Sequence, residues 1–285
     1  MEKLKLIECP RDAMQGFMNF VPTEVKVEYI NMLLKCGFDT LDFGSFVSPK
    51  AIPQMRDTAE VLKKLELSGP TKLLAIIANE RGAEEAGSFD EISYLGYPFS
   101  VSEEFQLRNT NSTIAESFKR IESIQSICER NGKKLVVYLS MGFGNPYGEP
   151  WSAEIVANWS ERLFNELDIR IQALSDTIGA GNSELVSYLF SNLIPSLPDV
   201  EFGAHLHVQP DSAVEILAAA YNAGCRRFDS AIRGFGGCPM AKDDLTGNMP
   251  TEKMLEWFKT NNITTGISPN YFNISFDYSS NVFKL

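Results

Sequence analysis

The sequence predicts an α/β fold, a (β/α)8 TIM barrel that forms a single domain over residues 1–285. First, short apolar runs alternate with longer amphipathic segments along the chain, as in βαβ units of a parallel sheet. Second, eight such units suit a barrel, whose usual length is ~250 residues. Third, an open doubly wound sheet is the competing fold, but no Gly-x-Gly-x-x-Gly pattern follows the first predicted strand.

The predicted strands are short apolar runs that end in polar residues or glycine. In chain order they are Leu4–Glu8, Thr40–Phe43, Lys72–Ile77, Glu91–Leu95, Lys134–Ser140, Arg170–Leu174, Glu201–His207 and Arg226–Ser230. In a barrel of this class the catalytic residues lie at the C-terminal ends of the strands. Unusual residues of this chain recur at those ends, so we expect the functional site there.

Helical patterns occupy the segments between the strands. Examples are Thr23–Cys36, Thr113–Asn131, Ser152–Leu167, Asp211–Ala223 and Thr251–Asn261.

The predicted helix ends carry local signals. Thr23, Ser152 and Thr251 precede acidic residues, which indicates capped helix starts. Gly132 and Gly224 indicate helix ends, because glycine readily adopts the left-handed conformation found there. The tail 267–285 has no clear role.

Composition and charge exclude several function classes. The net charge of −11 opposes binding to nucleic acid and to anionic membranes. No apolar stretch approaches the roughly 18 residues of a membrane span, and the N-terminal apolar run is too short for a secretion signal. The five cysteines form no Cys-x-x-Cys pair, which indicates reduced thiols and no structural zinc. We therefore expect a soluble, cytoplasmic protein that can still bind a small phosphorylated ligand.

The chain has two histidines, His205 and His207, at the end of the seventh predicted strand. Side chains alternate between the two faces of a strand, so both imidazoles point to the same space. Two imidazoles in this arrangement can bind one divalent metal ion. A buried, hydrogen-bonded pair without metal is the alternative interpretation.

Charged residues follow other predicted strands. Arg11-Asp12 follows the first strand and is either functional or a surface ion pair. Asp42 ends the second strand, and a buried carboxylate there needs a basic partner, a helix to cap or a ligand. Asp176 stands in a glycine-rich turn after the sixth strand, where it either caps the turn or faces the barrel opening.

A glycine-rich loop follows the eighth strand. Gly234, Gly236 and Gly237 predict a lid over the barrel opening, with the Cys238 thiol at its tip. Cys238 is otherwise a small apolar loop residue. Asn248 lies beyond the loop and offers an amide oxygen, a ligand suited to Mg²⁺ or Mn²⁺.

Taken together, these motifs resemble the 3-hydroxy-3-methylglutaryl-CoA (HMG-CoA) lyase family of metal-dependent TIM barrels. The resemblance runs from about Leu4 to about Gly266 and is carried by motifs that occur in the family's order. They are Arg11-Asp12, Ser45-Phe46-Val47-Ser48-Pro49-Lys50, Pro53-Gln54-Met55, Asp176-Thr177-Ile178-Gly179, His205-x-His207, Gly236-Gly237-Cys238-Pro239-x-Ala241-Lys242 and Gly247-Asn248.

The resemblance implies specific roles for residues at the strand ends. The implied metal ligands are Asp12, His205, His207 and Asn248, and the implied catalytic residues are Arg11, His205, Cys238, Asp42 and Asp176. Arg11 would stabilise an enolate, and His205 would also transfer a proton. Gln15 and Ser45, together with Arg11, are the predicted substrate-binding residues.

The resemblance implies cleavage of HMG-CoA to acetyl-CoA and acetoacetate, a reaction of leucine degradation and ketone-body formation. The expected cofactor is Mg²⁺ or Mn²⁺, the expected partner is an acyl-CoA, and a homodimer is compatible with the sequence. In physical terms, such a cleavage needs a base for the tertiary hydroxyl and an electrophile for the enolate.

Two departures from the family pattern leave other readings open. The family has glutamate at the position of Asp42, and it continues His-x-His with Asp-Thr-Tyr-Gly where this chain has Val208-Gln209-Pro210-Asp211-Ser212. One alternative is a related lyase that acts on another 3-hydroxyacyl-CoA or on a free hydroxy acid. The other is a barrel without catalytic activity, which the retained motif residues disfavour.

Overall fold

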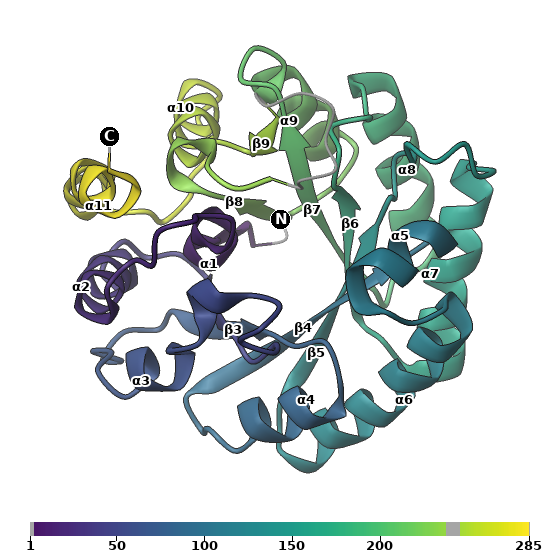
Figure 1. Ribbon diagram of the computed structural model, residues 1–285. Coiled ribbons are helices and arrows are strands. Elements are labelled where there is room, and N and C mark those ends of the chain that lie inside the picture. The colour runs from purple at the N-terminus through teal and green to yellow at the C-terminus, as the bar shows by residue number, and fades with distance from the viewer. Residues whose placement is uncertain (1–2, 238–245, 285) are drawn as a thin grey trace.

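Eight parallel strands form a closed barrel in the computed structural model, which describes residues 3–237 and 246–284. Neighbouring strands follow the order β6-β5-β4-β3-β2-β1-β8-β7, and β6 pairs with β7 to close the ring. The strands are β1 (Lys5–Glu8), β2 (Thr40–Ser45), β3 (Lys72–Ile76), β4 (Ile92–Ser100), β5 (Lys134–Ser140), β6 (Ile171–Asp176), β7 (Glu201–Val208) and β8 (Arg227–Ser230). The predicted (β/α)8 barrel is confirmed (Figure 1).

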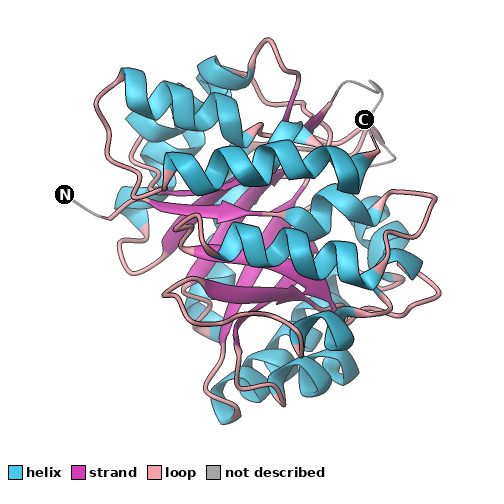
Figure 2. Ribbon diagram, turned by 90° about the vertical axis from the view of Figure 1, so that its left-hand side faces the viewer, coloured by secondary structure: helices cyan, strands magenta, loops and turns pink. Residues whose placement is uncertain are grey.

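Helices surround the strands on the outside (Figure 2). The outer helices are α2 (Thr23–Leu34), α3 (Thr58–Leu62), α4 (Glu80–Gly87), α6 (Ile114–Arg130), α7 (Ala153–Leu167), α8 (Ser183–Ser196), α9 (Ala213–Asn222), α10 (Thr251–Thr260) and α11 (Pro269–Phe283). Shorter elements are α1 (Pro10–Gln15), α5 (Glu103–Thr110), η1 (Pro53–Met55), η2 (Ile232–Gly234) and β9 (Gly247–Asn248). Among the residues described, no helix has the length and apolar character needed to cross a membrane.

All eight predicted strands are present, and β4 continues five residues beyond the predicted end at Leu95. The added residues include Gly96 and Pro98, which are uncommon inside strands. Gly96 leaves space for Ile76, because a Cβ at Gly96 would lie 2.5 Å from the Cδ1 atom of Ile76. The pairing with β5 continues to Ser100 and keeps the segment extended.

One of the three predicted helix caps is confirmed, since the Ser152 side chain accepts a hydrogen bond from the backbone N–H of Ile155. Thr23 and Thr251 are instead the first residues of α2 and α10, with no side-chain cap. Each hydroxyl donates to a buried or largely buried carboxylate: Thr23 to Asp57 at 2.8 Å and Thr251 to Glu8 at 2.6 Å. These long-range bonds replace the local caps.

The predicted helix ends at Gly132 and Gly224 are confirmed by positive φ angles of 64° and 102°.

The barrel interior is apolar on one side and polar on the other. The apolar side consists of residues on β3 to β6, namely Leu74, Ile76, Tyr94, Val136, Tyr138, Ile171 and Ala173. On the other side lie Cys9, directly after β1, and Asp42, His205 and Asp229 on β2, β7 and β8, all of them buried. Because polar groups are buried only where they find partners, this side of the barrel defines the candidate site.

The tail that had no clear role forms α11, which packs against α2 and completes the ring of helices (Figure 1). Its last residue, Phe283, stacks on Phe235 with ring centroids 4.3 Å apart and contacts Phe17 at 5.4 Å. Arg233 donates to the Ser279 hydroxyl at 2.8 Å. The C-terminal helix therefore holds the start of the glycine-rich loop.

We expect Phe283→Ala to lower the free energy of unfolding by about 3–5 kcal/mol, because a buried aromatic side chain is lost and a cavity remains. Urea unfolding measures this change. Tyr271→Ala is the matched control on α11, since Tyr271 is 44% exposed, and its effect should stay within about 0.5 kcal/mol. Equal effects of the two substitutions would contradict the role assigned to Phe283.

Candidate active site

The candidate site is a cavity of about 200 Å³ at the C-terminal ends of the strands. Its polar lining includes Arg11, Asp12, Gln15, His205 and His207. These residues come from α1, which directly follows β1, and from the end of β7, as the sequence predicts for a barrel. The cavity is therefore placed where catalytic groups of this fold meet.

His205 and His207 point to the same space, as the strand alternation predicts, with ring centroids 5.3 Å apart. Nδ1 of His207 lies 3.2 Å from the backbone oxygen of Thr177 and donates to it. Nε2 of His207 is buried, has no hydrogen-bond partner among the described residues, and lies 3.7 Å from Oδ2 of Asp12. An unpartnered buried nitrogen is costly, so this atom is arranged for a ligand.

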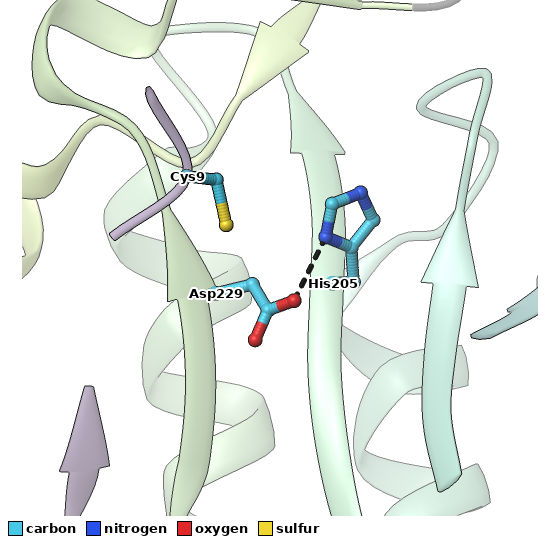
Figure 3. A group of neighbouring side chains, drawn as sticks. All are labelled: Cys9, His205 and Asp229. Carbon is cyan, nitrogen blue, oxygen red and sulfur yellow. Dashed lines mark hydrogen bonds and ion pairs between the residues drawn. The ribbon is translucent and has the colours of Figure 1, made fainter. Parts of the chain in front are cut away.

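His205 is fixed by a carboxylate beneath it. Its Nδ1 lies 3.1 Å from Oδ2 of Asp229, and the other ring nitrogen points away from Asp229 (Figure 3). The Tyr138 ring packs edge-on against the imidazole, with centroids 5.3 Å apart. Burial lowers the pKa of His205, but the hydrogen bond and charge of Asp229 outweigh it and leave the pKa above its usual value.

Asp12 lies on α1, which begins at Pro10, a residue suited to the first turn of a helix. Burial favours protonation of Asp12, but the charge of Arg11, helped by the nearby His205 and His207, holds the pKa of this carboxyl well below its usual range. Asp12 therefore presents a carboxylate to the cavity.

Asn248 is brought to Asp12 by β9, which pairs antiparallel with β7 so that Asn248 lies opposite His207. Its Nδ2 donates to Oδ2 of Asp12 at 2.6 Å and to the backbone oxygen of Phe235 at 2.8 Å. Gly236 permits this approach, because a Cβ there would lie 2.5 Å from Nδ2 of Asn248. A half-turn of the amide would direct its oxygen toward Asp12 instead.

The donor set fits a divalent cation. One ligand atom each from Asp12, His205 and His207 lies within 4.8 Å of the others. Each histidine uses Nδ1 for a hydrogen bond to an oxygen, which is the common arrangement of metal-binding histidines. Two imidazole nitrogens and a carboxylate suit Mn²⁺ and, with further oxygen ligands, Mg²⁺.

Arg11 is held between two carboxylates. Its Nε donates to Asp42 at 2.9 Å, and Nη2 also donates to Asp42. Its Nη1 donates to Asp12 and to Gln15, each at 2.9 Å. A guanidinium has five N–H donors, so one N–H on Nη2 is left without a partner among the described residues. Arg11 is thus held rigidly at the wall of the cavity.

Asp42 pairs with a basic side chain, Arg11. A basic partner is one of the alternatives that the sequence left open for this carboxylate. Burial raises the pKa of Asp42 to about 6, and the adjacent Arg11 limits the rise. Its catalytic role stays a prediction.

Asp176 and Ser45 engage nearby backbone groups. The Asp176 carboxylate accepts from the N–H groups of Ala180 at 2.9 Å and Gly181 at 2.7 Å, and thereby closes the turn after β6. The Ser45 hydroxyl accepts from the N–H of Val47 at 3.2 Å. These contacts are positional, and the predicted catalytic and substrate-binding roles of the two residues remain predictions. Cys238 and the predicted tip of the lid lie outside the described residues.

The sequence interpretation missed two supporting acids, Asp229 and Glu8. The signal for Asp229 was present in the sequence. Arg227 and Asp229 are two residues apart in the predicted strand Arg226–Ser230, so their charged side chains lie on the same face. Glu8 has no such signal. It faces outward from β1 and accepts hydrogen bonds from the N–H of Ile232 at 2.8 Å and from Thr251, residues distant in the sequence.

Comparison with known proteins places this geometry among enzymes of one family. The family model described as HMGL-like matches residues 4–272. Mitochondrial hydroxymethylglutaryl-CoA lyase of Mus musculus is 32% identical over 270 residues, which cover 94% of this chain and 82% of the relative.

Two solved structures share the fold over nearly the whole chain. HMG-CoA lyase of Brucella melitensis has a TM-score of 0.92 at 28% identity and covers 100% of both chains. An HMG-CoA lyase of Acinetobacter baumannii, solved in complex with coenzyme A and 3-methylmalate, has a TM-score of 0.90 at 29% identity and covers 99% of this chain and 92% of that chain.

We expect Glu8→Gln to change how stability depends on pH. Burial raises the pKa of Glu8 from its usual 4.5 to about 8, so the folded state holds a proton that the unfolded state releases between these values. Stability from this group therefore falls as the pH rises through that window, by at most ~1.4 kcal/mol per pH unit. Urea unfolding near pH 5 and pH 8 measures it. A constant difference between Glu8→Gln and the parent protein at both pH values would contradict this assignment.

Proposed function

The chain belongs to the HMGL-like family, and on that premise we propose that this carbon–carbon lyase cleaves HMG-CoA to acetyl-CoA and acetoacetate. The single observation that carries the proposal is the meeting of two groups at one cavity. The Arg11-Asp12 pair lies beside the same-face histidines of β7. A fixed guanidinium next to a metal-binding donor set is what stabilisation of an enolate requires.

We propose that Asp12, His205, His207 and Asn248 hold one Mg²⁺ or Mn²⁺. The unpartnered Nε2 of His207 supports this assignment. When bound, the cation would polarise the oxygens of the substrate and ease loss of the hydroxyl proton. Asn248 would contribute its amide oxygen after the half-turn described above.

Arg11 would stabilise the enolate oxygen that develops as the carbon–carbon bond breaks. Its remaining N–H on Nη2 is available, and its hydrogen bonds to Asp42, Asp12 and Gln15 fix the guanidinium before the reaction begins. Preorganised charge of this kind lowers the barrier, because the protein does not reorganise during the reaction. Gln15 in turn donates to Oδ1 of Asp12 at 2.7 Å, so its amide bonds both side chains of the Arg11-Asp12 pair and fixes their relative position.

The two predicted roles of His205 exclude each other while a cation is bound. Nδ1 is paired with Asp229, so binding of a cation through the other nitrogen leaves no site for proton transfer. We therefore propose that His205 is a ligand in the loaded enzyme. Proton transfer by His205 would require its outer nitrogen to be free.

An acyl-CoA is the proposed substrate class. The cavity combines the polar groups with apolar side chains of Val47, Ile52 and Phe105, which suits a short branched acyl group next to carboxylate and hydroxyl oxygens. The A. baumannii structure, which contains coenzyme A and 3-methylmalate, supports a coenzyme A derivative and a hydroxy acid as ligands of this architecture. A part in leucine degradation or ketone-body formation is proposed from the family resemblance. A cytoplasmic location is proposed from the composition, and a homodimer is compatible with the sequence.

Asp42 favours a second candidate, a lyase for a related 3-hydroxyacyl-CoA or hydroxy acid. Asp42 binds Arg11 directly, and it is one methylene shorter than the glutamate that the family has there. The shorter side chain draws the guanidinium toward β2 and changes the space left for the acyl group. The segment after His207, Val208-Gln209-Pro210-Asp211-Ser212, also departs from the family pattern.

We expect the protein to cleave HMG-CoA in the presence of Mg²⁺ or Mn²⁺ in an assay with a panel of 3-hydroxyacyl-CoA thioesters. Cleavage of another panel member but not of HMG-CoA would favour the second candidate. Asp42→Glu should then shift the ratio of kcat/KM values toward HMG-CoA by ~10- to 100-fold, the effect of a small displacement of a catalytic group. No cleavage of any thioester by protein with bound metal would refute the proposed activity.

Arg11→Gln should lower kcat by a few hundred-fold, about 3–4 kcal/mol, because a donor to the transition state is lost. Steady-state kinetics measures the change. Arg226→Gln is the matched control: Arg226 donates to the backbone oxygens of Tyr221 and Cys225 at the opposite end of β8, and its substitution should leave kcat nearly unchanged. Near-parental turnover in Arg11→Gln would remove Arg11 from the mechanism.

A further inference from the structure

Strand β8 directs two charged side chains into the barrel, Arg227 and Asp229. They are 1% and 3% exposed. Residues two apart on a strand share a face, so both lie in the interior beneath the candidate cation site. Burial of charge is expensive unless it is compensated. The proposed mechanism gives neither residue a task.

The two carboxylate oxygens of Asp229 have different surroundings. Oδ2 accepts from Nδ1 of His205 at 3.1 Å, whereas Oδ1 is buried and has no hydrogen-bond partner among the described residues. The imidazole is therefore held by Asp229 from one side and by the edge-on Tyr138 ring from another. Both contacts determine which way the outer nitrogen of His205 points.

Arg227 supplies the nearest positive charge on the same strand. Its Nη1 donates to Glu201 at 3.2 Å, while Nε and Nη2 have no partner within the described part of the chain. Gly203 provides the space, because a Cβ there would lie 3.0 Å from Cδ of Arg227. Burial lowers the pKa of Arg227, and the Asp229 carboxylate is the first of the groups that raise it above its usual value. The two charges thus offset one another inside the barrel.

Cys9 lies next to His205 and Asp229 but does not hold the imidazole in place. Its thiol lies in the same group as His205 and Asp229 (Figure 3). The thiol donates to the backbone oxygen of Ile7 at 3.9 Å, and Nδ1 of His205, the ring nitrogen on this side, is already paired with Asp229. The group is therefore a support for His205 and not a second cation site.

We propose that Asp229 is a positioning residue of the cation site, which fixes His205 with Nδ1 as donor and Nε2 directed toward Asp12, while Arg227 balances its charge. This inference rests on the cation site of the proposed function. It does not depend on which substrate is cleaved. A carboxylate that accepts from a metal-binding histidine orients the ring and makes the ligand more basic.

The test measures Mn²⁺ binding alone by calorimetry, in the parent protein and in Asp229→Asn. Asparagine keeps the shape of aspartate but removes its charge. We expect one Mn²⁺ per chain and a Kd that is 10- to 100-fold larger in Asp229→Asn. The visible absorption spectrum of bound Co²⁺ should also change, because the ligand field reports the orientation of His205. A Kd within about twofold of the parent value would overturn the proposal.

Asp57→Asn is the matched control for loss of a buried carboxylate. The side chain of Asp57 is 8% exposed and pairs with Lys26 at 2.7 Å, away from the cavity. Its substitution should destabilise the fold and leave the Kd for Mn²⁺ unchanged. Equal weakening in both variants would overturn the specific role of Asp229. A second Mn²⁺ that is lost in Asp229→Asn would do so too, because Asp229 would then be a ligand.

The double variant Asp229→Asn/Arg227→Met covers the case in which Asp229→Asn does not fold. It removes both interior charges together, so no unpaired charge is left by the loss of Asp229. The same weakening of Mn²⁺ binding is expected, and parental affinity would overturn the proposal. Absence of Mn²⁺ binding in the parent protein would refute the proposed cation site itself. Unchanged Mn²⁺ affinity in the variants would refute only the positioning role of Asp229.

Discussion

The site depends on the burial of Arg11 between Asp42 and Asp12, each of which is at most 6% exposed. A buried ion pair adds little net stability, because removal from water costs about as much as the attraction returns. Its value here is positional. The two carboxylates fix the guanidinium, and Asp12 at the same time belongs to the group that fits a cation. Charge compensation around Arg11 therefore sets the geometry of both functional groups.

The same constraint extends down the barrel as an alternation of charges. His205 lines the cavity, and below it lie Asp229, then Arg227, and finally Glu201, which also pairs with Lys5. Each charge has an opposite charge near it, so the polar side of the interior is tolerated beside an apolar side made by β3 to β6. The barrel can thus support a polar site without unfolding around it.

Outer elements fix the loops that carry the site. Glu8 connects the end of β1 to Ile232 and to Thr251, at the start of η2 and of α10. The terminal turn of α11 stacks on Phe235, whose backbone oxygen accepts from Asn248. A predicted cation ligand is thereby connected to the C-terminal helix, although neither that helix nor Phe235 lines the cavity. Positions far from the reacting atoms contribute to the precision that catalysis needs.

The sequence by itself determined the barrel, its eight strands and the common face of His205 and His207. These follow from periodicity, which needs only neighbouring residues. The sequence also located the candidate residues at the strand ends, where this fold gathers them.

Only the tertiary structure decided which of these residues touch. Asn248 meets Asp12 across 236 positions of the chain, Asp42 selects Arg11, and Asp229 supports His205 from the next strand. The hydroxyls of Thr23 and Thr251 bind distant carboxylates instead of capping their own helices. Such pairings depend on closure of the barrel, because a buried polar group bonds to whichever polar group lies within reach after folding. The periodicity of the sequence contains no information about which groups those are.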